Sequence, residues 1–171
     1  MAERRMDEVT RTVDALVQVE KTVGEFYGSC SEVFAHDSEF WLTLARDEFL
    51  HADVLVKLHE NIIREPHKFR SGERFPLATL RAFVSHVHSQ SEKLMAGRLT
   101  MYEALAAAYQ IERTIIEQKY LGAIRTEKPE YVEALDKLAV ETAGHRERIK
   151  TKMEEYRKSG REIGKDKAPS E

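Results

Sequence analysis

The sequence predicts an all-α protein, arranged as a four-helix bundle with one long crossover connection. Three observations lead to this fold class. The chain of 171 residues has only eight glycines and four prolines, which suits long helices better than many short strands. Apolar residues recur every three or four positions over long stretches, as on one face of a helix. The length suits one domain with a sizeable core.

The first half of the chain predicts two long helices. One runs from about residue 7 to 34, with a single apolar face. The next begins with Asp37 or Ser38 as its N-cap and ends before Pro66. The apolar face of the first helix consists of Val9, Val13, Leu16, Val17, Val23, Tyr27 and Phe34.

The second half predicts a connection and two further long helices. Residues 68–76 are polar and form a loop, and a less apolar helix from Leu77 to Met95 lies within the crossover. Thr100 and Glu103 form a capping box that opens the third long helix, and Pro129 opens the fourth. We therefore expect the bundle to comprise residues 1–158, with a frayed or disordered tail at 159–171.

Composition limits the classes of partner. The 27 basic and 30 acidic residues are interspersed, so the sequence shows no basic surface for nucleic acid. The chain has neither an apolar leader nor an apolar run long enough to span a membrane, which predicts a cytoplasmic protein. Its single cysteine, Cys30, forms neither an internal disulfide nor a thiolate metal site.

Each long helix carries a carboxylate within its apolar face. These residues are Glu20, Glu48, Glu112 and Glu141, and the second helix adds His51 three residues after Glu48. Residues three apart on a helix differ by about 60° around the axis, so Glu48 and His51 can share one target. The two helix pairs space their acids similarly, by 28 residues from Glu20 to Glu48 and 29 from Glu112 to Glu141.

A metal site explains these acids best. Facing carboxylates in a core repel one another and are costly to bury unless protons or cations compensate them. Four carboxylates balance two divalent ions, and imidazole adds a neutral nitrogen ligand. Mixed oxygen and nitrogen ligands favour iron or manganese over calcium or structural zinc. The alternative is a set of core carboxylates hydrogen-bonded to tyrosine or arginine.

The pattern resembles the ferritin-like di-iron carboxylate superfamily and, within it, the rubrerythrin-like branch. The stretches that carry the resemblance are VEKTVGEFY, LARDEFLHADVL, AAAYQIERTIIEQKY and LAVETAGHRERI, within residues 7–157. The resemblance implies a ferritin-like bundle with a di-iron site. Glu20 and Glu112 would be ligands from the first and third long helices, and Glu48 and His51 from the second.

The fourth long helix departs from the family pattern. The second Glu-x-x-His would place a glutamate at position 142, where this sequence has Thr142, and Glu141 lies four residues before His145. A small rotation of the helix would bring Glu141 into reach. If Glu141 is a ligand with His145, two iron ions fit; if not, three carboxylates predict a mononuclear, weak or empty site, with manganese or a single metal as further possibilities.

The resemblance implies reduction of peroxide or dioxygen, in protection from oxidative stress or in iron handling. The sequence lacks the cysteines of a rubredoxin-like domain, so electrons would come from an external donor. Tyr27 and Tyr109 are expected either to border the site as hydrogen-bond donors or to pack in the core. The competing interpretation is a non-catalytic bundle that serves as a scaffold or interaction protein. The family resemblance also implies a homodimer.

Five other histidines fall outside the apolar faces and are expected on the surface. They are His36, His59, His67, His86 and His88.

Overall fold

The computed structural model describes residues 2–72, 76–117, 122 and 124–159, and most of them are helical. The helices are α1 (Ala2–Val33), α2 (Ser38–Arg64), α3 (Leu77–Met95), α4 (Met101–Glu117) and α5 (Pro129–Lys158). The predicted all-α class is confirmed. Of the predicted tail at 159–171, residues 160–171 lie outside the described residues.

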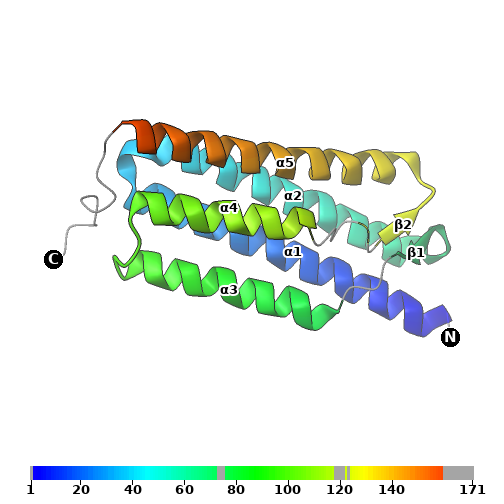
Figure 1. The fold of residues 1–171 in the computed structure, drawn as a ribbon. Coiled ribbons are helices and arrows are strands. Elements are labelled where there is room, and N and C mark those ends of the chain that lie inside the picture. Colours follow the sequence, from blue (N-terminus) through cyan, green and yellow to red (C-terminus); the bar gives the residue numbers. More distant parts are fainter. Residues whose placement is uncertain (1, 73–75, 118–121, 123, 160–171) are drawn as a thin grey trace.

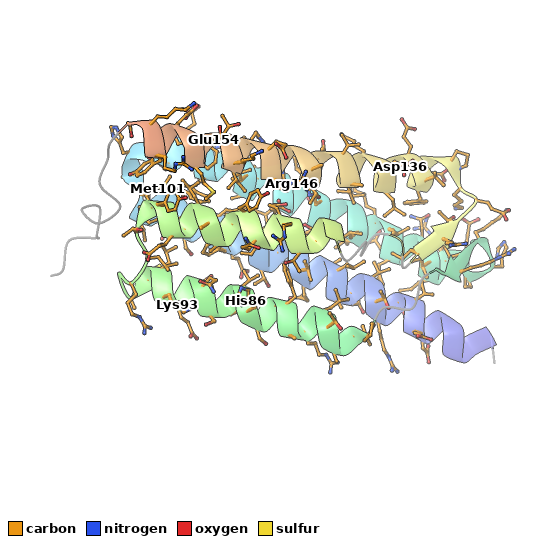
Figure 2. The ribbon with its side chains drawn as sticks, viewed as in Figure 1. His86, Lys93, Met101, Asp136, Arg146 and Glu154 are labelled. Atoms are coloured by element: carbon orange, nitrogen blue, oxygen red, sulfur yellow. The ribbon has the colours of Figure 1, made fainter. Side chains whose placement is uncertain are left out.

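The helices lie side by side along one common direction (Figure 1). Helix α1 packs along both α2 and α3, α4 packs along α5, and fewer contacts join α2 to α5 and α3 to α4. Helix α3, expected within the crossover, packs against the side of α1 and carries exposed residues such as His86 on its outer face (Figure 2).

The predicted capping residues lie at the starts of the helices, although not all of them form the expected capping hydrogen bond. At the start of α4, the backbone N–H of Thr100 donates to Glu103 Oε2 at 2.8 Å and the Glu103 N–H donates to Thr100 Oγ1 at 3.3 Å, which confirms the capping box. Asp37 is the N-cap of α2 but makes no capping hydrogen bond with its side chain. Its carboxylate pairs with Lys152 of α5 at 2.6 Å instead, so Asp37 joins two helices.

A small antiparallel sheet was not predicted. Strand β1 (Phe69–Ser71), within the predicted loop, pairs with β2 (Ile124–Thr126), with Phe69 opposite Thr126. Three-residue strands are too short to show the alternation that identifies a strand in a sequence. Beside the sheet, Lys128 and Glu65 form an ion pair. The sheet and this pair tie the segment after α2 to the segment before α5.

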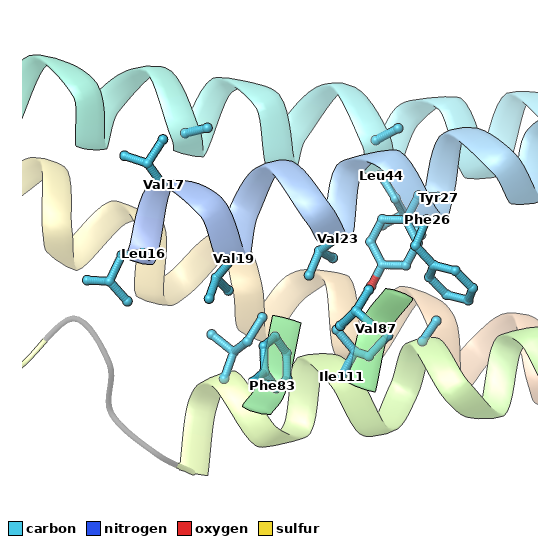
Figure 3. Packing of buried hydrophobic residues seen from close by; sticks show 14 of the residues in the cluster. Leu16, Val17, Val19, Val23, Phe26, Tyr27, Leu44, Phe83, Val87 and Ile111 are labelled. Atoms are coloured by element: carbon cyan, nitrogen blue, oxygen red, sulfur yellow. The ribbon is translucent and has the colours of Figure 1, made fainter. Parts of the chain in front are cut away.

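Apolar side chains from several helices form one continuous core. Val23 and Tyr27 of α1 face Phe83 and Val87 of α3 and Ile111 of α4 (Figure 3). Burial of each such side chain stabilises the fold by about 1.5–3 kcal/mol. Within this apolar surrounding, the buried carboxylates are Glu20, Glu48 and Glu112 among the residues described.

None of the helices in the described part of the chain combines the length and the apolar character that crossing a bilayer requires.

Candidate metal centre

The centre is built from side chains on the buried faces of α1, α2, α4 and α5. Glu20 lies on α1, Glu48 and His51 on α2, Glu112 on α4 and His145 on α5, and each is 5% exposed or less. On each helix these residues follow the same 3.6-residue period as the neighbouring core residues, so burial of the apolar face also buries the polar groups. The structure therefore brings together five of the six residues that were predicted as metal ligands.

The first group consists of Glu20, Glu48 and His51, which offer three ligand atoms within 4.8 Å of one another. His51 Nδ1 lies 3.3 Å from Glu48 Oε2 and 3.8 Å from Glu20 Oε2. The glutamate and histidine of the Glu-x-x-His motif thus face one place together with an acid from the neighbouring helix.

The second group consists of Glu48, Glu112 and His145, also with three ligand atoms within 4.8 Å. His145 Nδ1 lies 2.6 Å from Glu48 Oε1 and 3.6 Å from Glu112 Oε1. Glu48 therefore belongs to both groups, with Oε2 directed to His51 and Oε1 to His145.

The two groups are adjacent parts of one buried site. The rings of His51 and His145 are stacked, with centroids 5.4 Å apart and planes inclined by 12°. Both rings present Nδ1 to the carboxylates of the site, and both present Nε2 to a further carboxylate outside it.

These outer carboxylates fix the orientation of the two imidazoles. His145 Nε2 lies 3.2 Å from Asp47 Oδ2, and the same oxygen accepts a hydrogen bond from Arg148 at 2.8 Å. His51 Nε2 lies 3.1 Å from Glu141 Oε2. A carboxylate on the far nitrogen of a histidine holds the ring in place and makes the near nitrogen a better metal ligand.

Sequence reasoning did not find Asp47. It lies about 100° around the helix from its neighbour Glu48, off the apolar face, and is 35% exposed. The only sequence feature that could have indicated Asp47 is its position as an acidic residue directly before the Glu-x-x-His motif. Its partner, His145, comes from a helix far along the chain.

Glu141 lies outside both groups. It is half-exposed and contacts the outer nitrogen of His51, while Thr142 occupies the buried position one turn before His145. Thr142 Oγ1 donates to the carbonyl of Leu138 at 2.9 Å. The buried face of α5, which includes Leu138 and Ile149, sets this rotation of the helix and directs Glu141 toward the rim.

The two tyrosines differ in position. Tyr27 is fully buried beside Trp41, and its hydroxyl donates to Glu112 Oε1 at 2.6 Å, so it both packs in the core and borders the site. Tyr109 lines a surface pocket with Lys150 and Arg157.

Burial and charge together set the protonation of the metal-free site. Burial raises the pKa of Glu20 to about 8, because an ionised carboxylate loses its hydration there. Burial lowers the pKa of an imidazole, but the carboxylates beside these two histidines outweigh that effect. Glu20 and Glu48 raise the pKa of His51 to about 11, and Glu112 and Glu48 raise that of His145 to about 10. Without metal, protons therefore neutralise the site.

The residues fit a divalent transition metal. Four buried atoms of the site lack a hydrogen bond of suitable geometry: Glu48 Oε1, Glu112 Oε2, His51 Nδ1 and His145 Nδ1. The two histidine nitrogens meet only the carboxylates of the site, with His145 Nδ1 2.6 Å from Glu48 Oε1 and His51 Nδ1 3.3 Å from Glu48 Oε2, so either protons or a bound cation must compensate these buried groups. Three carboxylates and two imidazoles form a mixed oxygen and nitrogen set of the kind that iron and manganese accept.

The other histidines lie away from this site. His36, His67, His86 and His88 are exposed, and half-buried His59 pairs with Asp14 at 3.3 Å. The prediction that these histidines lie on the surface is confirmed for the four exposed ones.

Comparison of the chain with protein-family models, with curated proteins and with solved structures finds no match.

Proposed function

We propose that this protein is a ferritin-like di-iron carboxylate protein of the rubrerythrin-like type that reduces peroxide or dioxygen. The observation that supports the proposal is Glu48, one buried carboxylate with an oxygen directed to each of two Glu/Glu/His groups. The four helices that supply these residues are the four on which the ferritin-like pattern expects ligands.

Iron bound in both groups would supply two electrons, the number that reduction of a peroxide requires. Glu20 and His51 would hold one ion, Glu112 and His145 the other, and Glu48 would contribute to both. The chain itself orients the imidazoles through Asp47 and Glu141, as described above. The surrounding core is apolar and buried, and the Tyr27 hydroxyl provides a hydrogen-bond donor 2.6 Å from Glu112.

Electrons for turnover would come from a separate donor. The sequence has one cysteine, and Cys30 is buried, so the residues described offer no thiolate iron site to relay electrons. Protection from peroxide and handling of iron are both consistent with such a centre.

Anaerobic reconstitution with Fe²⁺ tests the proposal. We expect about two Fe²⁺ per chain and an oxidation signal in the visible spectrum on addition of peroxide. Glu48→Ala should reduce both, because it removes the carboxylate common to the two groups. Glu25→Ala, an exposed change on α1, is the matched control. Less than one equivalent of iron together with no oxidation signal would exclude the proposed function.

The second candidate is a non-catalytic bundle with a degenerate or mononuclear metal site. The position of Thr142 favours it, because the buried site holds three carboxylates rather than four. In that case Glu20→Ala and Glu112→Ala would raise the melting temperature by removing buried acids, and would leave the metal content unchanged. Loss of metal in both variants would support the di-iron proposal.

The homodimer stays a prediction. Helix α2 exposes Leu42, Phe49 and Leu50, which offer an apolar surface to a second chain. Sedimentation velocity tests it: a monomer at all concentrations would contradict the prediction.

A further inference from the structure

A cavity of about 510 Å³ lies between α1 and α3. Residues of α1 from Arg11 to Thr22 and residues of α3 from Leu77 to His88 line it, and each stretch extends about 16 Å along its helix. The volume lies within the range of pockets that hold small molecules. Among the described residues, the lining includes no side chain of the metal centre, so the cavity is a separate site.

The two ends of the cavity differ in chemistry. Helices α1 and α3 run in the same direction (Figure 1), so the lining residues follow the same order on both. Arg11 and Arg81 lie in the half nearer to the start of the two helices. Leu80 and Val84 provide an apolar wall, and Thr22 lies at the end opposite Arg11. The cavity therefore has a cationic half, an apolar wall and a hydroxyl group at its far end.

The cationic half lacks a matching acid. Neither Arg11 nor Arg81 forms an ion pair with a residue that the structure describes. Asp14 is the single acid among the described lining residues, and its Oδ1 already lies 3.3 Å from His59 Nε2 of α2. Two arginines and one aspartate leave a net charge of about +1, which one carboxylate balances. A planar guanidinium group also matches a carboxylate in geometry, with two parallel hydrogen bonds.

The hydroxyl group of Thr22 has no partner in the described part of the chain. Thr22 is 5% exposed, and no hydrogen bond of its side chain is found there, although the buried Thr12 and Thr142 each donate to the carbonyl four residues earlier. A buried hydroxyl without a partner is costly. Because Thr22 lines the cavity, a ligand that accepts a hydrogen bond at this end would satisfy it.

We propose that the cavity between α1 and α3 binds an elongated organic acid, with a carboxylate at one end, an apolar chain, and an uncharged polar group such as a hydroxyl at the other end. Arg11 and Arg81 hold the carboxylate. Leu80 and Val84 contact the chain, and Thr22 donates to the far polar group. The inference depends neither on the metal centre nor on the proposed function.

Calorimetric titration of the full chain with four probes tests the three features separately. The probe ω-hydroxyoctanoate has all of them, octanoate lacks the hydroxyl, octanediol lacks the charge, and acetate lacks the chain. We expect ω-hydroxyoctanoate to bind about 3- to 10-fold more tightly than octanoate, and octanediol about 10-fold more weakly than ω-hydroxyoctanoate. Acetate should not bind in the same range. The affinity of both long acids should fall as salt is added, because the two arginines are exposed.

Substitutions on the two helices locate the ligand. Thr22→Val keeps nearly the same shape, so it should abolish the preference for ω-hydroxyoctanoate and leave the affinity for octanoate unchanged. Arg11→Gln and Arg81→Gln should each weaken octanoate about 3- to 10-fold. Lys93→Gln removes an exposed cation of α3 that is not among the lining residues, and as the matched control it should bind both acids like the parent. The melting temperature of each variant checks that it is folded.

Amide chemical shifts then show where the acids bind, and we expect changes at residues 11–22 and 77–88. Shifts confined to the exposed apolar residues Leu42, Phe49 and Leu50 of α2 would overturn the proposal, because the acids would then bind another surface. Unchanged octanoate affinity in both arginine variants, equal binding of octanediol and ω-hydroxyoctanoate, or no binding of either acid at millimolar concentration would overturn it as well. A preference for the hydroxyl that persists in Thr22→Val would refute the role of Thr22.

Discussion

Replacement of Glu20 by glutamine tests the electrostatics of the metal-free centre. The amide has nearly the shape of a protonated carboxyl group but cannot ionise. Glu20 is 5% exposed, and burial raises its pKa from 4.5 to about 8. Because folding raises this pKa, the folded protein keeps a proton that the unfolded chain releases above about pH 4.5.

The raised pKa sets both the sign and the size of the effect. The stability that Glu20 contributes is fully present below pH 4.5 and is lost as the pH rises to about 8. Each pH unit in this window costs the folded state about 1.4 kcal/mol, which sums to on the order of 5 kcal/mol. Between pH 5 and pH 7 we therefore expect Glu20→Gln to gain about 3 kcal/mol of unfolding free energy relative to the parent.

Urea denaturation of both proteins with a chelator present, at several pH values from 5 to 7, measures this difference. Glu25→Gln changes an exposed glutamate on the same helix, so its unfolding free energy should vary with pH in the same way as that of the parent. Added metal should make the parent more stable than Glu20→Gln, because the Glu20 carboxylate is a metal ligand whereas the glutamine amide binds metal poorly. A difference between Glu20→Gln and the parent that does not change with pH would refute the reasoning, since Glu20 would then titrate normally.

Three further predictions concern the partners of the site. The pKa values of about 11 for His51, about 10 for His145 and about 8 for Glu20 mean that all three carry a proton at pH 7 without metal, so loading with Co²⁺ should release about three protons per chain. Calorimetry in buffers of different ionisation enthalpy measures this, and binding without proton release would contradict it. Asp47→Asn weakens the hold on His145 and should lower metal affinity about 10- to 100-fold in a chelator competition; unchanged affinity would show that the contact does not orient the ring. Tyr27→Phe leaves Glu112 without its hydrogen-bond donor and should destabilise the metal-free protein by about 1–3 kcal/mol in urea, whereas a change within error would mean that a water molecule replaces the hydroxyl.

The secondary structure could be predicted because its signals are local. The period of the apolar residues and the Thr100/Glu103 capping box placed the helices, and α2, α3 and α5 begin and end, and α4 begins, within a few residues of the prediction. Helix α1 begins earlier than predicted, at Ala2, because its first turns have no apolar face to mark them. The pairing of β1 with β2 was missed because it joins segments that are distant along the chain.

The sequence by itself determined which side chains are buried together on each helix. The spacing of Glu48 and His51, and the place of Glu20, Glu112 and His145 on apolar faces, follow from the geometry of a single helix.

The tertiary structure alone decided the relations between helices. That Glu48 serves both groups, and that Asp47 contacts His145, depends on the rotation and the relative height of α2 and α5. Successive residues differ by about 100° around a helix, so packing of Leu138 and Ile149 is enough to place Thr142 inside and Glu141 at the rim. One sequence pattern permits several such rotations, and only the packed core selects among them.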